Sequence, residues 1–329
     1  MDQAQEAHLA AVARQSHVPV LRERILDLFA PALEREGAIH VDGTLGMGGH
    51  AEAILDRFEK LRLIGIDRDP QALELAAARL ERFGDRVQLV RAVNSEIPRV
   101  LDDLGIPEID GCLVDLGLSS LQIDHTERGF SYATDAPLDM RMGPDAPLSA
   151  AEVVNQYSAD DLVRIFRGYG EERQSARIAQ RIVARRAERP FATSADLVEV
   201  VTAAIPAAVR SQSHGHPAKR VFQALRIEVN GELDALAALL PGVIGRLAVG
   251  GRFVVLAYHS LEDRLVKTAF TRATSDDVPP ELPVVPDHLR ARFVALTRGA
   301  EKPTTTEIQQ NPRAASARLR AIECIREAA

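Results

Sequence analysis

The chain has 329 residues, a length that fits one large α/β domain or a core domain that carries an insertion. Its 46% hydrophobic and 26% charged residues are typical of a globular protein, and no apolar run is long enough to span a membrane. Aromatic residues make up only 4% and tryptophan is absent, which argues against a stacking surface of the RRM type. The net charge of −7 means that any nucleic-acid footprint must be local.

The N-terminal segment, residues 1–16, lacks the charged-then-apolar pattern of a secretory signal and is predicted to be a flexible lead-in. The two cysteines, Cys112 and Cys324, lie in apolar, strand-like runs. A disulfide framework or a zinc site needs more thiols or a tighter spacing, so we predict two buried thiols. These features together predict a soluble cytoplasmic protein.

Short β-branched runs alternate with helical stretches from residue 39 onward, a pattern that predicts an α/β fold with a parallel sheet covered on both faces. The predicted strands of the parallel part are, in chain order, Ile39–Asp42, Leu61–Asp67, Val87–Val90, Gly111–Asp115 and Arg252–Tyr258. Two later runs, Phe293–Thr297 and Leu319–Ile325, are predicted to add an antiparallel edge.

The alternation stops after the fourth strand, where long helical periodicities begin. The predicted helices are Asp160–Phe166, Arg173–Arg189 and Ser194–Ile205, with Ser194 as the N-cap of the last. We therefore predict a helical insertion over residues 123–215, between the two halves of a core domain at residues 17–122 and 216–329.

Glycines after the first strand predict a nucleotide-binding turn. Gly46, Gly48 and Gly49 would let the backbone pass close to a ligand, and Asp67 at the end of the second strand can accept hydrogen bonds from ribose hydroxyls. The same G-x-G-x-x-A pattern fits NAD, and a tight turn without a ligand is a further alternative. Asp42 at the end of the first strand favours a cationic methyl donor, because a carboxylate would repel a pyrophosphate.

The fourth strand ends at Asp115, which is followed by a short loop that contains Ser119 and Ser120. Ligands in open α/β sheets lie beyond the carboxyl ends of the strands. Methylation of an aromatic amine needs acceptors for its N–H groups, so that the nitrogen lone pair faces the electrophilic methyl group. Asp115 and this loop can supply such acceptors, although an ordinary strand end with a capping aspartate has the same residues.

Several long segments in a fixed order give the chain its resemblance to a known family. They are His17–Leu21 (HVPVL), Asp42–His50 (DGTLGMGGH), Gly65–Pro70 (GIDRDP), Asp115–Asp124 (DLGLSSLQID), Arg128–Tyr132 (RGFSY), Pro137–Met142 (PLDMRM), Tyr169–Arg173 (YGEER), His216–Asn230 (HPAKRVFQALRIEVN), Tyr258–Arg264 (YHSLEDR) and Asn311–Arg320 (NPRAASARLR). Over residues 17 to about 326, the chain resembles the bacterial 16S ribosomal RNA (cytosine-N4)-methyltransferase family, the MraW-like small-subunit methyltransferase H group.

The resemblance implies a class I, Rossmann-like S-adenosylmethionine-dependent methyltransferase core with an inserted helical domain. It implies N4-methylation of a cytidine in the decoding region of 16S ribosomal RNA. It places the methyl donor on Gly48, Gly49, His50, Asp67, Asn94, Asp115 and Gln122. Asn94 and Tyr258 stand where phenylalanine is more usual, so the Asn94 amide would hydrogen-bond the adenine and Tyr258 keeps an aromatic ring.

A basic helix supplies the predicted RNA footprint. The predicted RNA-binding residues are Arg173, Arg177, Arg181 and Arg185, which are spaced by four, together with Lys219 and Arg220. Residues spaced by four share one helix face, and such a ridge can follow a phosphate backbone. The tail residues Arg313, Arg318 and Arg320 add positive charge. The alternative is a solvated face paired with Glu171, Glu172 and Glu188.

His259, just after the fifth strand, completes the predicted catalytic set of Asp115, Ser119, Ser120 and His259. Its role is left open between taking a proton from the methylated nitrogen, contacting RNA and packing. A strong base is not required, because the nitrogen becomes acidic once it is methylated.

Two further polar segments have less specific patterns. Asp139 and Arg141 would either shape a cytosine pocket or form a salt-bridged loop. His214 and His216 flank a glycine and have no acidic partner nearby, so a loop is favoured over a metal site and no metal is expected.

Two other functions compete with RNA methylation. One is an NAD-dependent oxidoreductase, and the other is a non-enzymatic ribosome assembly factor that retains a donor pocket. The expected partner is 16S ribosomal RNA within a small-subunit particle, because a globally acidic enzyme needs a shaped surface more than a naked strand. No membrane partner is expected, and the oligomeric state, a homodimer included, stays open.

Overall fold

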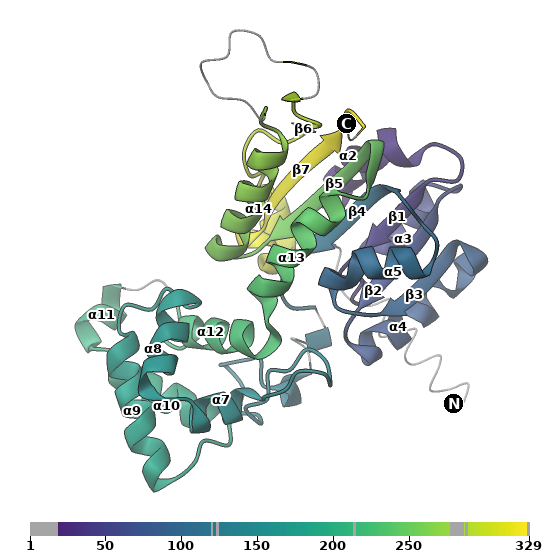
Figure 1. The fold of residues 1–329 in the computed structure, drawn as a ribbon. Coiled ribbons are helices and arrows are strands. Elements are labelled where there is room, and N and C mark those ends of the chain that lie inside the picture. Colours follow the sequence, from purple (N-terminus) through teal and green to yellow (C-terminus); the bar gives the residue numbers. More distant parts are fainter. Residues whose placement is uncertain are drawn as a thin grey trace, which may run out of the picture. The chain divides into compact units, whose positions relative to one another are not determined.

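The computed structural model describes residues 19–119, 121–122, 125–212, 215–276, 286 and 289–327. The chain forms two compact units (Figure 1). Unit 1 combines the chain before residue 121 with the chain from residue 234 onward, and unit 2 is residues 121–233. The predicted lead-in at residues 1–16 lies outside the described residues.

Unit 1 contains a seven-stranded sheet in the order β3-β2-β1-β4-β5-β7-β6. The strands are β1 (Ile39–Asp42), β2 (Arg62–Asp67), β3 (Val87–Arg91), β4 (Ile109–Asp115), β5 (Leu247–Ala257), β6 (Phe293–Ala295) and β7 (Arg318–Cys324). The first five are parallel, and β7 is antiparallel to both β5 and β6. The predicted parallel core and antiparallel edge are confirmed.

β5 begins earlier than its sequence pattern indicates. Leu247 already pairs with Ile109, whereas we predicted a start at Arg252. The ladder is irregular between Ile109 and Gly111, and Gly250 there has a φ of +85°. The glycines at 250 and 251 mark this irregularity inside the strand, although in the sequence they indicate its beginning.

Among the described residues, three helices pack on each face of this sheet. One face is packed by α2 (Arg22–Leu33), α3 (Gly49–Arg57) and α4 (Pro70–Leu80), and the other by α5 (Ile97–Asp103), α13 (Glu232–Ile244) and α14 (Ser260–Ala273). Shorter elements are η1 (Glu81–Arg86), η2 (Asn94–Glu96), α15 (Thr305–Gln310) and η5 (Pro312–Ser316). Leu113 and Val114 belong to opposite cores, as the alternation of a doubly covered strand requires. Cys112 and Cys324 are buried free thiols, which confirms their predicted state.

Unit 2 is helical. Its elements are η3 (Thr126–Arg128), α7 (Ala150–Gln156), α8 (Ala159–Gly168), α9 (Ser175–Glu188), α10 (Ser194–Ala204), α11 (Ala207–Gln212) and α12 (Lys219–Asn230). α9 packs against α8 and α10, and α12 packs against α7 and α8. Unit 2 thus extends through α12, a helix that the sequence assigned to the core domain.

The N-cap of α10 is Thr193, so the prediction of Ser194 is wrong. The Thr193 hydroxyl accepts a hydrogen bond from the backbone N–H of Asp196. Ser194 is buried and has another task, because its hydroxyl donates to the Thr134 carbonyl at 2.9 Å and accepts from the Ala136 N–H at 3.0 Å. Thr193 therefore caps the helix, and Ser194 attaches the loop at residues 134–136 to it.

Asn230, the last residue of α12, ties this helix to the loop at residues 137–142. Its Oδ1 accepts from the Met142 N–H at 2.8 Å, and its Nδ2 donates to the carbonyls of Met140 and Arg226 at 2.8 and 2.9 Å. We call these three bonds the Asn230 clamp. The residue is buried, so the clamp replaces water for several polar groups at once.

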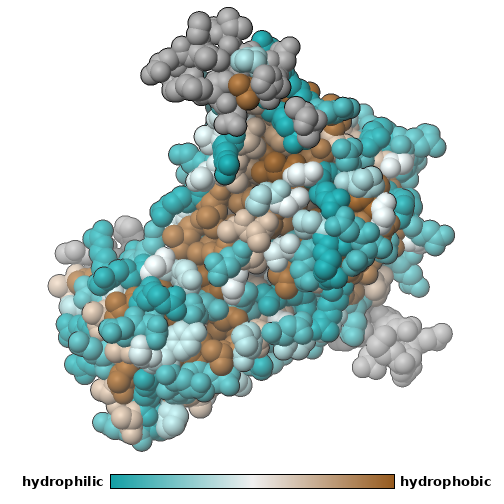
Figure 2. Space-filling model, viewed as in Figure 1, coloured by the Kyte–Doolittle hydropathy of each residue, from teal (hydrophilic) through white to brown (hydrophobic). Residues whose placement is uncertain are grey.

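Hydrophilic side chains occupy much of the surface visible in Figure 2. Among the described residues, the large apolar side chains that are exposed are Val209, Val249, Val294 and Ile325. No helix in the described part of the chain has the length and apolar character needed to cross a membrane.

Candidate active site

Three carboxylates end neighbouring parallel strands of unit 1. Asp42 ends β1, Asp67 ends β2 and Asp115 ends β4. β1 lies between the other two strands, and Asp42 is paired in register with Gly65 on one side and Leu113 on the other. The carboxyl ends of these strands therefore form one acidic edge, which is where a ligand of an open α/β sheet binds.

The glycine turn after β1 is built around Asp67. The Gly46 N–H donates to Asp67 Oδ2 at 2.7 Å, and the Asp69 N–H donates to Oδ1 at 2.9 Å. Gly48, the N-cap of α3, has a φ of +77°, a backbone conformation that strains other residues. A carboxylate has about four acceptor positions, so Asp67 can still receive a hydroxyl from a ligand.

Asp42 is the most buried carboxylate of the acidic edge, with 1% of its surface exposed. Burial raises its pKa to about 7, although the nearby His50 opposes this rise. Asp115 and Asp67 add to it through repulsion between negative charges. A cationic ligand would favour the charged form of Asp42, so this position suits a positively charged molecule.

The Asp115 carboxylate is held by one side-chain hydrogen bond and faces a histidine ring. The Tyr258 hydroxyl donates to its Oδ1 at 2.7 Å, and His50 Nε2 lies 3.6 Å from its Oδ2. Its backbone N–H donates to Thr44 Oγ1 at 2.6 Å, which fixes the end of β4 to the turn after β1. The Asp115 side chain is 26% exposed, so the oriented carboxylate stays accessible to a substrate.

The ring of Tyr258 is itself fixed by its surroundings. Its backbone N–H donates to Glu262 Oε2 at 2.8 Å, and a Cβ at Gly117 would lie 3.2 Å from its ring. Burial raises the pKa of Tyr258 well above its usual value, and the neighbouring Asp115 adds to this rise. The hydroxyl therefore remains a donor. From the sequence we expected Tyr258 only to keep an aromatic ring, and its bond to Asp115 was missed.

Two residues that we predicted to bind the methyl donor have a buried polar atom without a hydrogen-bond partner among the described residues. These atoms are His50 Nε2 and Asn94 Oδ1. Buried polar atoms are almost always paired in folded proteins. A ligand with matching groups, such as the amino group of an adenine toward Asn94, would supply the missing partners. With the acidic edge, these atoms make the site fit a cationic adenosyl donor.

The remaining predicted site residues have different placements. The Ser119 Cβ lies 3.7 Å from where a Cβ on Gly46 would stand, so this serine is beside the glycine turn. Ser120 lies outside the described residues. Gln122 is buried in unit 2, and its contact with a donor stays a prediction.

His259 is the N-cap of α14. Its Nδ1 accepts from the Glu262 N–H at 3.4 Å, and its Nε2 lies 3.1 Å from Glu262 Oε1. Only 10% of the ring is exposed. Both ring nitrogens thus face Glu262, and the geometry supports the packing role among the three that the sequence left open.

The predicted RNA-binding residues divide by exposure. Arg177 and Arg181 lie on α9 and are exposed, and Arg173 is exposed but precedes the helix, which starts two residues later than predicted. Arg185 is 22% exposed and lies 3.4 Å from Asp196. It also lies over the ring of Phe191. The first three are available to a phosphate, whereas Arg185 holds α9 to α10.

Other cations of the predicted footprint are partly engaged. Lys219 is exposed, and Arg220 donates to the Glu171 carbonyl at 3.3 Å. In the tail, Arg318 and Arg320 both bind Asp263, at 3.1 and 2.7 Å. These two arginines attach β7 to α14, which reduces their availability to RNA.

The polar loop at residues 137–142 contains an ion pair. Arg141 Nη2 lies 2.7 Å from Asp139 Oδ2, and both side chains are partly exposed. The alternative of a salt-bridged loop is thus realised. His214 lies outside the described residues, and no cluster of metal-binding side chains occurs in the described part of the chain.

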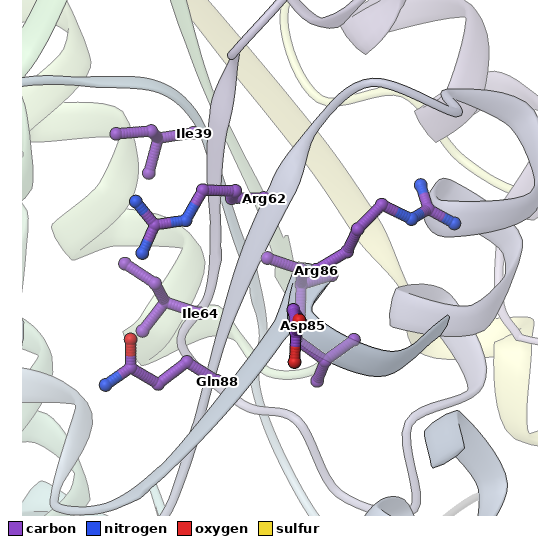
Figure 3. Close-up of a pocket in the computed structure, with 8 residues that line it drawn as sticks. Ile39, Arg62, Ile64, Asp85, Arg86 and Gln88 are labelled. Carbon is purple, nitrogen blue, oxygen red and sulfur yellow. The ribbon is translucent and has the colours of Figure 1, made fainter. Parts of the chain in front are cut away.

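A hollow of about 210 Å³ lies at the amino ends of the strands, opposite the acidic edge at their carboxyl ends (Figure 3). It is lined by Ile39, Arg62, Leu63, Ile64, Asp85, Arg86, Val87 and Gln88. Ile39, Arg62 and Val87 are the first residues of β1, β2 and β3, so the hollow is at the amino ends of these strands. It is therefore separate from the acidic edge.

The model of the MraW methylase family matches residues 14–325. Among curated relatives, the Ribosomal RNA small subunit methyltransferase H of Cutibacterium acnes is 57% identical over 310 residues, which cover 94% of this chain and 92% of the relative. The proteins of the same name from Renibacterium salmoninarum and Thermobifida fusca are both 58% identical, over 94% and 95% of this chain and 95% and 94% of their own lengths.

A match of this length and identity decides against the NAD-dependent oxidoreductase that the glycine turn left open. The sheet order, the acidic edge and the family match agree with one another. The chain belongs to the MraW methylase family, a family of S-adenosylmethionine-dependent methyltransferases.

Proposed function

We propose that this protein methylates the N4 atom of a cytidine in the decoding region of 16S ribosomal RNA. The names of its relatives support a ribosomal RNA of the small subunit, and the family resemblance supports cytosine N4. The observation that carries the chemistry is the carboxylate of Asp115, which is oriented by Tyr258 at the carboxyl end of β4.

The acidic edge and the glycine turn are the proposed donor site. S-adenosylmethionine supplies an electrophilic methyl group on a positively charged sulfur. Asp67 would accept its ribose hydroxyls, Asn94 would accept from its adenine, and Gly48, Gly49, His50, Asp115 and Gln122 complete the proposed set. A bound cation would favour the charged form of Asp42, so this residue suits a cation better than a pyrophosphate.

Asp115 has the proposed catalytic role. The exocyclic nitrogen of cytosine is a weak nucleophile because its lone pair is delocalised into the ring. An acceptor that binds its N–H groups turns the lone pair out of the ring plane and toward the methyl group. Asp115 Oδ1 is occupied by Tyr258, so Oδ2 is the oxygen better placed to accept from the substrate. Ser119 and Ser120 are proposed to assist as further acceptors.

Unit 2 is the proposed RNA-binding unit. Arg173, Arg177, Arg181 and Lys219 are exposed there and can contact phosphates. Because the chain has a net charge of −7, we propose that the substrate is a small-subunit particle, which presents a shaped surface. We also propose that the enzyme acts in the cytoplasm.

Mass mapping of the nucleosides of 16S RNA tests this function. RNA from cells that lack the protein should lose the N4-methylcytidine signal, and the wild-type gene should restore it. The variant Asp115→Asn should fail to restore the signal, while the purified protein still binds S-adenosylhomocysteine in a calorimeter with an affinity lowered by the loss of one contact of the donor set. The matched control is Asp110→Asn at the other end of β4, where the carboxylate binds Arg35.

An unchanged N4-methylcytidine signal in cells without the protein would refute the assigned product. Full methylation by Asp115→Asn would refute the assigned mechanism. Ribosome assembly that depends on the protein but not on Asp115, in cells without methylation, would instead favour a non-enzymatic assembly factor.

A further inference from the structure

Three aromatic rings form a column in unit 2. The rings of Tyr132 and His216 are stacked, with centroids 4.8 Å apart and planes inclined by 14°. The rings of Tyr132 and Phe222 are nearly perpendicular, with centroids 5.9 Å apart, and Phe222 is buried. His216, at the other end of the column, is exposed, while Tyr132 is partly buried. The column therefore runs from the helical core of the unit to an imidazole ring at its surface.

The two stacked rings come from two segments of the family resemblance, at residues 128–132 and 216–230, and the sequence indicated no RNA-binding role for either ring. Both segments are held firmly. The Met140 N–H donates to the Arg128 carbonyl at 2.9 Å, and the Asn230 clamp joins Met140 to α12. His216 Nδ1 accepts from the Ala218 N–H at 3.2 Å, which fixes the ring just before this helix. We call the two nearly parallel rings the Tyr132–His216 stack.

Positive charge lies beside the stack in the chain. Lys219 and Arg220 form the start of α12 and are exposed. Lys219 forms no ion pair with any residue that the structure describes, and its backbone N–H donates to the His216 carbonyl at 3.0 Å. An exposed ring with cations within one helical turn is the combination that single-stranded RNA-binding surfaces use for a base and its phosphate.

We infer that the exposed face of His216 stacks on an unpaired base of the RNA substrate, with Lys219 on the adjacent phosphate. The inference rests on the proposed function and deepens it, because it names a part of the molecule that contacts the RNA. The low aromatic content argued against a broad stacking surface, and a single ordered stack is consistent with that composition. Purely structural packing would give the same column without any effect on RNA.

The absence of tryptophan from the sequence provides a direct probe. His216→Trp introduces one fluorophore on Tyr132, and Val209→Trp introduces one on α11, where the native valine is 41% exposed. We expect a cytidine dodecamer to quench the fluorescence at position 216 and an abasic oligomer of equal length and charge to leave it unchanged. The fluorophore at position 209 should respond to neither. Equal quenching by both oligomers at position 216 would overturn the inference.

Methylation kinetics give the second readout. With 30S particles from cells that lack the enzyme, His216→Ala should raise KM for the particles about tenfold, as the loss of one stacked base does. The kcat and the affinity for S-adenosylhomocysteine should not change, and His216→Phe should restore KM because it keeps a ring. An unchanged KM in His216→Ala, or a failure of His216→Phe to restore it, would overturn the stacking role.

The two proposals can fail separately. If the mass map shows no loss of N4-methylcytidine, the assigned product is wrong, whatever the fluorescence shows. If methylation is confirmed but neither quenching nor KM depends on the ring at position 216, only the stacking inference is wrong. Thermal unfolding of each variant checks that the exposed substitution leaves unit 2 folded.

Discussion

The hydroxyl of Tyr258 donates a 2.7 Å hydrogen bond to Oδ1 of Asp115, across 143 positions of the sequence. This bond joins the residue that follows β5 to the last residue of β4, and it leaves the second oxygen of Asp115 near His50. A hydrogen bond to a charged group restricts that group more than a neutral bond does. The bond therefore gives the proposed catalytic carboxylate a defined orientation before any substrate binds.

Removal of this bond should slow methyl transfer. Tyr258→Phe introduces the residue that is more usual in the family and keeps the ring against Gly117, but in this chain it frees Asp115 to rotate. We therefore expect kcat to fall roughly tenfold, or about 1.4 kcal/mol of transition-state stabilisation. Transfer of tritiated methyl groups to 30S particles measures the rate. The matched control is Tyr157→Phe, which removes a 2.9 Å bond from a tyrosine to Glu228 in unit 2. Equal losses in the two variants would show a general effect on folding.

The titration of Asp42 should make stability depend on pH. Its pKa in the folded protein is about 7, above its ordinary value of 3.8, because the carboxyl group is buried. The folded state therefore binds this proton more tightly than the unfolded state does. The stabilisation that results is complete below about pH 4 and is lost as the pH rises through 7. In this range we expect the free energy of unfolding to fall by up to about 1.4 kcal/mol per pH unit from this group.

Urea unfolding between pH 5 and pH 8 measures this effect, and Asp42→Asn should reduce the decline. Asp263 provides a contrast of opposite sign, which appears only below this pH range. Although burial favours its neutral form, Arg320 and Arg318 hold its pKa below the ordinary value, so its contribution is present at neutral pH and lost on acidification. A decline of the same size in wild-type protein and Asp42→Asn would contradict the prediction.

The exposed arginines of α9 should contribute to RNA affinity but not to stability. For Arg177→Ala/Arg181→Ala we expect weaker binding to 16S RNA and a salt dependence reduced by about one to two charges. The free energy of unfolding should change by less than about 0.5 kcal/mol, because neither guanidinium has a partner among the described residues. Filter binding at several salt concentrations measures the slope.

Arg57→Ala/Arg62→Ala lowers the net charge equally from exposed positions of unit 1. If it reduces the slope as much as the α9 variant, the effect comes from the global charge and the α9 face has no particular role. Arg185→Ala is expected to behave differently from both, with a clear loss of stability, because it breaks the contact with Asp196.

The Asn230 clamp should stabilise unit 2. Asn230→Ala leaves the Met142 N–H and the Met140 carbonyl without their partner, and we expect a loss of about 2–4 kcal/mol in the free energy of unfolding. Asn155→Ala is the graded comparison, since Asn155 makes two hydrogen bonds to the backbone of Phe191 and is only partly buried. Hydrogen exchange of the amides at 140 and 142 should report the loss locally. A loss below about 0.5 kcal/mol would contradict the role of the clamp.

Local patterns predicted the sheet because each strand end has a nearby signal. Asp67 is followed by Asp69 and Pro70, and in the structure Asp69 caps α4 with Pro70 in its first turn. Side-chain roles that depend on distant partners could not be predicted this way. The contact of the His259 ring with Glu262 and that of Arg185 with Asp196 are visible only in the structure.

The choice between adjacent residues of one type was also beyond the sequence. Thr193 and Ser194 are both good caps, and only the burial of Ser194 beside Ala136 decides between them. The end of unit 2 was missed for a similar reason, because α12 is joined to the helical unit by side chains such as Asn230 that a linear pattern does not reveal.

The position of β7 has a consequence for how the protein is made. This strand, at residues 318–324, lies between β5 and β6 and pairs with β5 over six residues. Until the ribosome has synthesised it, the edge of β5 has no neighbour on that side and presents unpaired backbone groups and apolar side chains. Chains interrupted before this point should therefore aggregate or be degraded, and chaperones that bind nascent chains should act until the last strand has emerged.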